Sequence, residues 1–154
     1  MKLTTRIIGK RKSIALVAHD HKKASLVAWA LRHKDLLAQH ELLATGTTGN
    51  LIEQSLGQPV TKMYSGPLGG DQQLGARIAD GKIDVMIFFW DPMEAQPHDS
   101  DVKALLRVAV AWNVIIANDP ATADFIVSSP FMNGEYEAEV PDYTEYLNRQ
   151  VKGG

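Results

Sequence analysis

Short apolar runs alternate with amphipathic stretches along most of this 154-residue chain. The apolar runs are continuous and have the length of strands, which is typical of strands buried on both faces of a parallel sheet. The amphipathic stretches have helical spacing, most clearly over residues 22–33 and 102–110. Expected strands cover residues 14–18, 41–44, 60–64, 83–89 and 114–117, and expected helices cover about 22–33, 50–56, 72–79, 102–110 and 121–127.

A strand followed by a helix is repeated about five times, the connections are short, and no two strands are arranged as a hairpin. This order predicts the α/β class: a single-domain parallel-sheet sandwich, Rossmann-like or flavodoxin-like, with helices on both faces. We expect residues 1–154 to form this one domain, with residues 1–12 and 152–154 peripheral to it. A last amphipathic helix is expected over 142–151.

The amino-acid composition and charge exclude several kinds of site and several classes of protein. The hydrophobic content of 45% is enough for a substantial core, and the absence of cysteine excludes disulfides, thiol nucleophiles and thiolate metal sites. A net charge of −2 provides no basic excess to drive binding to nucleic acid or to an anionic membrane. The longest apolar run, 85–90, is too short to span a bilayer, and the N-terminus lacks a signal-peptide core. These features predict a soluble, cytoplasmic protein.

Three polar clusters follow predicted strands and lead into predicted helices: residues 44–50, 65–71 and 91–101. In an open parallel sheet such segments meet at the carboxyl edge of the strands, where α/β proteins bind their ligands. Glycines allow close approach, hydroxyl groups and helix N-termini suit phosphate, and carboxylates with a histidine suit proton transfer. The combination predicts an enzyme that acts on a small phosphorylated molecule.

The first cluster is a candidate phosphate cradle. Thr45, Gly46, Thr47 and Thr48 offer hydroxyl and amide donors at the start of a helix, whose dipole also favours an anion. Lys23, one turn into the first helix, is positioned to add a compensating charge. The alternative is a simple turn in which Thr47 or Thr48 caps the helix, with Lys23 a solvated surface residue.

The second cluster ends in a carboxylate, Asp71, at the start of the next predicted helix. Aspartate is a preferred N-cap, so one interpretation is purely structural. In the functional interpretation Asp71 faces the strand-edge crevice, Gly69 and Gly70 let a substrate approach, and Ser65 and the Gly66 amide add phosphate donors.

The third cluster combines acids with a histidine on a stiff loop. Asp91 stands at the tip of the strongest predicted strand, Pro92 and Pro97 restrain the loop, and His98 and Asp101 lead into a helix. A histidine near a helix N-terminus tends to stay neutral, and a neutral imidazole can polarise a carbonyl oxygen. The alternative is that the acids only complement the helix dipole and end the strand.

The sequence His19-Asp20-His21 follows the first predicted strand. Two histidines two positions apart suit a metal, but spacing identifies no third ligand, so no metal site is expected. His19 is interpreted as a polar contact to substrate and Asp20 as a residue that orients its neighbours.

Taken together, these motifs resemble the methylglyoxal synthase family. The resemblance covers nearly the whole chain and is densest between residues 14 and 129. The matching strings are Val17-Ala18-His19-Asp20, Ala44-Thr45-Gly46-Thr47-Thr48-Gly49-Asn50-Leu51, Ser65-Gly66-Pro67-Leu68-Gly69-Gly70-Asp71-Gln72-Gln73, Phe88-Phe89-Trp90-Asp91-Pro92, Pro97-His98-Asp99, Asp101-Val102-Lys103-Ala104-Leu105 and Asn118 with Ala121-Thr122-Ala123-Asp124.

The resemblance implies a lyase that converts dihydroxyacetone phosphate to methylglyoxal and inorganic phosphate without a metal or organic cofactor. It implies that Asp71 is the catalytic base and that His98 contacts the substrate's oxygens. In our mechanistic hypothesis, Asp101 or Asp91 orients His98. The residues that the resemblance implies bind substrate, chiefly phosphate, are His19, Lys23, Thr45, Gly46, Thr47, Thr48, Ser65 and Gly66. It further implies a homohexamer that free phosphate inhibits, with allosteric kinetics resting on the resemblance alone.

Two other functions fit the same fold. A phosphate-binding sensor would need the cradle but neither Asp71 nor His98. An isomerase or aldolase acting on a sugar phosphate would also use an acid–base pair, although no lysine stands out as a Schiff-base former.

Overall fold

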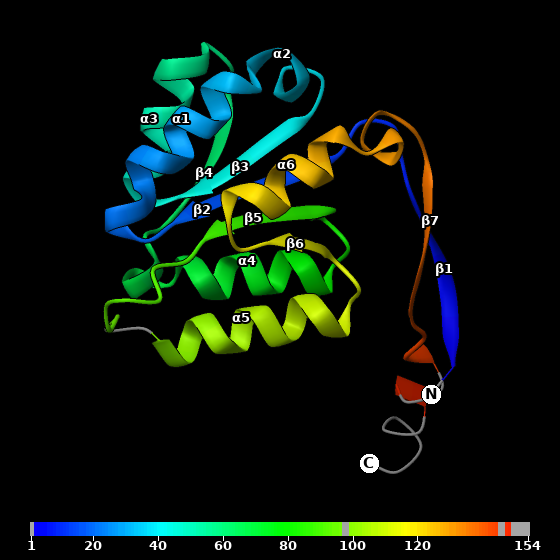
Figure 1. The fold of residues 1–154 in the computed structure, drawn as a ribbon. Helices are drawn as coiled ribbons and strands as arrows, with labels where there is room; N and C mark the ends of the chain where they lie inside the picture. Colours follow the sequence, from blue (N-terminus) through cyan, green and yellow to red (C-terminus); the bar gives the residue numbers. More distant parts are fainter. Residues whose placement is uncertain (1, 97–98, 145–146, 149–154) are drawn as a thin grey trace.

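A five-stranded parallel sheet forms the centre of the protein (Figure 1). The computed structural model describes residues 2–96, 99–144 and 147–148. The strands lie in the order β4-β3-β2-β5-β6. Their bounds are β2 (Ser13–Ala18), β3 (Glu41–Thr45), β4 (Val60–Met63), β5 (Val85–Phe89) and β6 (Ile115–Ala117).

Helices cover both faces of the sheet, α1, α3 and α6 on one and α4 and α5 on the other (Figure 1). Ile14 and Leu16 of β2 point into one core, whereas Ala15 and Val17 point into the other. This two-sided burial explains the continuous apolar runs and confirms the predicted fold class. The helices are α1 (Lys23–Arg32), α2 (Lys34–Leu37), α3 (Gly46–Leu56), α4 (Gly70–Ala79), α5 (Asp99–Ala111) and α6 (Pro120–Ser128), with 3-10 turns η1 (Asp20–Lys22), η2 (Gly66–Leu68) and η3 (Pro130–Asn133).

The strand order creates a crevice between β2 and β5. From β2 the chain moves outward to β3 and β4, then returns to β5 on the other side of β2 and continues to β6. Ala18 pairs with Phe89, so the carboxyl ends of the two strands lie side by side. Ligands of open α/β sheets bind at this topological switch point. His19 and Asp91, which follow the two strands, therefore lie beside it.

Two helices begin earlier than the sequence pattern predicts. Helix α3 starts at Gly46, so neither Thr47 nor Thr48 is its N-cap. Helix α4 starts at Gly70, and its N-cap is Gly69, whose φ of 108° is in the left-handed region that glycine favours. Asp71 is consequently the second residue of the helix, and its interpretation as an N-cap is wrong.

A two-stranded antiparallel ribbon was not expected from the sequence. It joins β1 (Leu3–Ile8) to β7 (Tyr136–Pro141), with Leu3 opposite Pro141, and it extends away from the sheet (Figure 1). Local sequence patterns cannot predict this pairing, because almost the whole chain separates the two strands. Of the helix expected over 142–151, residues 145, 146 and 149–151 lie outside the described residues. Within the described ranges, no helix has the length and apolar character needed to cross a membrane.

Candidate active site

A cavity of about 110 Å³ opens at the carboxyl edge of the sheet, between the ends of β2, β3 and β5 and the starts of α3 and α4. It brings together residues from four separate segments of the chain. Most of the residues predicted for the site line it: His19, Asp20, Lys23, Thr45, Gly46, Thr48, Ser65, Gly66 and Asp71.

Two buried threonines line one side of the cavity. Thr45 is 5% exposed at the end of β3, and Thr48 is 1% exposed in the first turn of α3. The Thr48 hydroxyl has no hydrogen-bond partner within the described part of the chain. Buried polar groups are nearly always paired, so an unpaired hydroxyl on a cavity wall suits a ligand oxygen. The N-terminus of α3 adds free amides and a favourable dipole for an anion.

Lys23 supplies a positive charge to the same cavity. Its Nζ donates to Thr47 Oγ1 at 2.9 Å and lies 2.9 Å from Asp20 Oδ1. The hydrogen bond and the charge of Lys23 lower the pKa of Asp20. Thr47 is exposed and does not line the cavity, but its hydroxyl holds Lys23 beside it. Lys23 is thus tied to the threonine segment rather than freely solvated.

Asp71 is a buried carboxylate in the cavity wall. It is 3% exposed and lies in the first turn of α4. The helix start packs directly on the preceding loop, because a Cβ added at Gly70 would lie 2.0 Å from the carbonyl oxygen of Tyr64. This close approach holds Ser65 and Gly66 beside Asp71. Asp71 and the threonine segment therefore line the same small cavity.

His19 reaches the cavity from the end of β2. The ring is 4% exposed and packs edge-on against Phe88, with centroids 5.2 Å apart. Its Nδ1 accepts a hydrogen bond from the backbone amide of Asp91 at 3.0 Å. In the neutral ring the proton consequently belongs to Nε2, which makes that nitrogen a donor.

Comparison with known proteins identifies the family of the chain. The family model of the MGS-like domain matches residues 25–118. The methylglyoxal synthase of Photorhabdus laumondii is 59% identical and that of Yersinia enterocolitica 54%, each over 99% of this chain and all of the relative. The chain belongs to the methylglyoxal synthase family. The crystal structure of methylglyoxal synthase from Elizabethkingia anophelis superimposes with a TM-score of 0.87 at 63% identity, covering 95% of this chain and 96% of the other.

Two of the acids predicted for a methylglyoxal synthase site, Asp91 and Asp101, do not line the cavity. Asp91 is 5% exposed, but it meets the site through its backbone amide, while its carboxylate accepts from the Met93 amide and faces His21. Asp101 lines a groove between α4 and α5 that Asp71 also lines. His98 lies outside the described residues.

Among the described residues that line the cavity, Gln96 is a polar side chain that was not predicted as a site residue. Gln96 lines the cavity from the loop that follows β5. It carries no motif of its own, so neither periodicity nor composition identifies it. The only available signal was its position, a polar side chain on a proline-restrained loop at the ligand-binding edge.

Proposed function

We propose that this protein converts dihydroxyacetone phosphate into methylglyoxal and inorganic phosphate. The observation that carries the proposal is that a buried aspartate, Asp71, lines one small cavity with Lys23 and with Thr48, whose hydroxyl has no partner among the described residues. The first group suits a general base and the other two suit phosphate. The names of its relatives, methylglyoxal synthases, support the same reaction.

The first step is removal of a proton from the hydroxymethyl carbon beside the carbonyl group, with Asp71 as the base. The electron pair moves onto the carbonyl oxygen and gives an enediolate. Donors aimed at that oxygen stabilise the developing charge. His19 Nε2–H is one candidate donor, and His98 is the second that the resemblance implies. Triosephosphate isomerase pairs a carboxylate with a neutral histidine for the same step.

The second step breaks the bond between carbon and the phosphate ester oxygen. Asp71 returns its proton to the former carbonyl oxygen, and the hydroxyl group on the deprotonated carbon passes its proton to the departing phosphate. The enediolate electrons close an aldehyde C=O at that carbon and shift the carbon–carbon double bond to the phosphate-bearing carbon, which expels phosphate as the leaving group. This requires the ester bond to stand perpendicular to the enediolate plane. Thr45, Thr48, Ser65 and the Gly66 amide would hold the phosphate in that position, and Lys23 would stabilise the departing anion. The released enol tautomerises to methylglyoxal, so neither an electron carrier nor a further reactant is consumed.

A single assay separates this function from its rivals. Purified protein is incubated with dihydroxyacetone phosphate, and methylglyoxal and free phosphate are both measured. Equal amounts of the two products are expected. Formation of glyceraldehyde phosphate without free phosphate would identify an isomerase, and saturable phosphate binding without turnover would identify a sensor.

We further propose that the enzyme is a cytoplasmic homohexamer that free phosphate inhibits at the substrate cavity. Large apolar side chains are exposed on the β1–β7 ribbon and near α6, namely Leu3, Ile7, Phe125 and Phe131. Exposed apolar patches of this kind favour association between copies. Sedimentation velocity should give six times the mass of one chain, and a monomer at assay concentration would reject the assembly. Phosphate should compete with substrate, and a sigmoidal rate curve would add the allosteric behaviour.

A further inference from the structure

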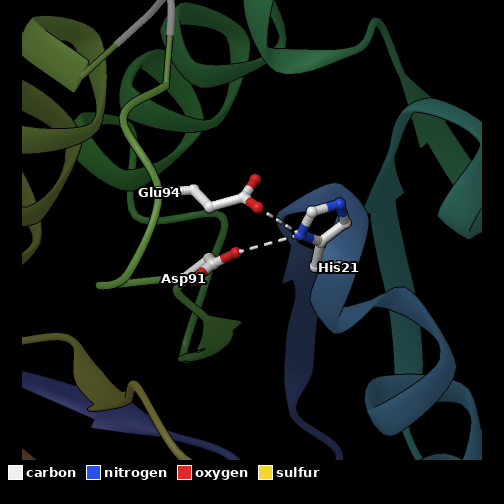
Figure 2. A group of neighbouring side chains, drawn as sticks. All are labelled: His21, Asp91 and Glu94. Atoms are coloured by element: carbon white, nitrogen blue, oxygen red, sulfur yellow. Dashed lines mark ion pairs between the residues drawn. The ribbon is translucent and has the colours of Figure 1, made fainter.

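A histidine and two carboxylates converge on one another in Figure 2, and none of the three lines the cavity. His21 comes from η1, whereas Asp91 and Glu94 come from the segment that follows β5. His21 Nδ1 lies 3.0 Å from Glu94 Oε1 and 3.6 Å from Asp91 Oδ2. One ligand atom from each residue lies within 4.8 Å of the other two. A single nitrogen therefore faces both carboxylates.

The charge of this cluster is unbalanced. Asp91 is 5% exposed, and one of its carboxylate oxygens accepts the Met93 amide while the other faces His21. No lysine or arginine among the described residues forms an ion pair with Asp91 or Glu94. A buried carboxylate is costly unless a cation or sufficient hydrogen bonds compensate it.

We propose that His21, Asp91 and Glu94 bind a divalent transition-metal ion such as Zn²⁺. Tetrahedral zinc with donors at about 2.1 Å holds those donors about 3.4 Å apart. The two separations from His21 Nδ1, 3.0 and 3.6 Å, bracket that value. His21 and Glu94 have mostly exposed side chains and can rotate to close the remaining difference. A fourth position stays open to water.

The donor set selects the kind of ion. One imidazole nitrogen with two carboxylate oxygens suits zinc and its neighbours, whereas magnesium and calcium prefer oxygen ligands alone. Sequence spacing did not identify this set, because Asp91 and Glu94 follow His21 by about 70 residues. The fold brings them together at the β2–β5 switch point.

An ion bound here would act on the cavity through its surroundings. It would join η1, at the start of α1, to the segment after β5. Asp91 holds the His19 ring through its backbone amide, and Gln96, two residues after Glu94, lines the cavity. The ion would contribute no ligand to the substrate, so the proposal does not depend on the reaction proposed above. Its role is to fix the loop beside the cavity.

Calorimetry on the full-length protein tests the site directly. The chelator-treated protein is titrated with zinc chloride in a phosphate-free buffer, and saturable binding of about one ion per chain is expected. His21→Asn and Glu94→Gln should each weaken binding by at least about tenfold, since each removes one ligand. Zinc should also raise the unfolding temperature of the wild type more than that of either variant, because the ion binds only the folded state.

His33→Asn is the matched control. His33 is also paired with a carboxylate, Asp124, at 3.1 Å, but only with one. Its loss should leave zinc affinity unchanged. Absence of saturable binding by the wild type would overturn the proposal, as would wild-type affinity in both His21→Asn and Glu94→Gln. Equal weakening in His33→Asn would also overturn it, because binding would then reflect surface imidazoles in general.

Discussion

The backbone amide of Asp91 donates a hydrogen bond to His19 Nδ1 at 3.0 Å, across the gap between the ends of β5 and β2. The two strands are neighbours in the sheet, and the chain changes direction between them. This single contact fixes the position of a buried ring and the nitrogen that carries its proton. It also makes Asp91 a positioning residue through its main chain, in addition to whatever its carboxylate binds.

Two substitutions of His19 should separate anchoring from substrate contact. In His19→Asn an amide oxygen replaces Nδ1 as acceptor for Asp91, while the Nε2 donor is lost. We expect a near-normal unfolding temperature and a KM for dihydroxyacetone phosphate raised about tenfold, the effect of one hydrogen bond to a charged group. His19→Gln keeps a donor at the far position but loses the anchor, so its unfolding temperature should fall. An unchanged KM in His19→Asn would show that His19 does not contact the substrate.

Asp71→Asn should keep the fold and lose the base. A buried carboxylate replaced by its isosteric amide leaves packing intact, so kcat should fall by about 10²- to 10⁴-fold while KM changes little. The measurement is steady-state production of methylglyoxal. Turnover within a few-fold of the wild type would show that Asp71 does not take the proton.

Asp119→Ala is the control for that variant. Asp119 also stands at a helix start, but it is a true N-cap whose carboxylate accepts from the Thr122 amide at 2.8 Å. Its loss should cost about 0.5–2 kcal/mol of unfolding free energy and leave kcat unchanged. The two aspartates should therefore show opposite effects on stability and rate.

Thr48→Val should weaken phosphate binding without weakening the fold. The Thr48 hydroxyl has no partner among the residues described, so valine removes no hydrogen bond from the free protein. We expect an unchanged or higher unfolding free energy, with the inhibition constant of phosphate and the KM for substrate both raised about tenfold. Thr61→Val, on the exposed side of β4, is the control and should change neither constant. Unaltered constants in Thr48→Val would reject the cradle.

The parallel sheet was predictable because each strand is buried on both faces and its sequence shows that directly. The β1–β7 ribbon was not, since its pairing joins residues at opposite ends of the chain and depends on no local pattern. The sequence pattern also predicts the starts of α3 and α4 later than the structure has them, because contacts and backbone angles in the fold decide these starts. Glycines at 46 and 70 are poor helix formers, but Gly46 has a φ of 57° in the left-handed region, and Gly70 lies too close to the Tyr64 carbonyl group for any side chain.

The site could be predicted from the positions of its residues relative to the strands more than from their residue types. Thr48, Asp71 and His19 come shortly after strands, and parallel strands bring their carboxyl ends to one edge, so convergence could be inferred from order alone. The direction of each side chain could not be inferred from the order of the elements. Thr47 and Thr48 are adjacent in the sequence, yet one is exposed and the other is buried, because successive residues of a helix point about 100° apart.

Stability should depend on pH through His40. Burial lowers the pKa of His40, whose Nδ1 accepts the Lys12 amide at 2.9 Å and whose Nε2 lies 3.2 Å from Asn133 Oδ1. The folded state therefore favours the neutral ring. Its contribution to stability is fully present above the unfolded-state pKa of 6.5 and is lost as the pH falls from there through the lower folded value.

His40→Asn tests this pH dependence. Asparagine keeps an acceptor near the Nδ1 position but does not titrate, so the unfolding free energy should fall less between about pH 7.5 and pH 5 than in the wild type. Urea unfolding at several pH values gives the two slopes. If the unfolding free energy falls equally with pH in the wild type and the variant, groups other than His40 cause the loss of stability in acid.

Gly70→Ala should disrupt the site from the backbone. The added Cβ would lie 2.0 Å from the Tyr64 carbonyl oxygen and 2.9 Å from its carbon, and backbone atoms cannot rotate away as a side chain can. The loop bearing Ser65 would have to shift, so we expect a loss of about 1–3 kcal/mol of unfolding free energy together with a lower kcat/KM. Gly75→Ala, in the same helix, meets no atom within 4 Å and should instead gain about 0.5–1 kcal/mol with unchanged activity. Similar behaviour of the two variants would mean that helix propensity, rather than the contact at Tyr64, governs this segment.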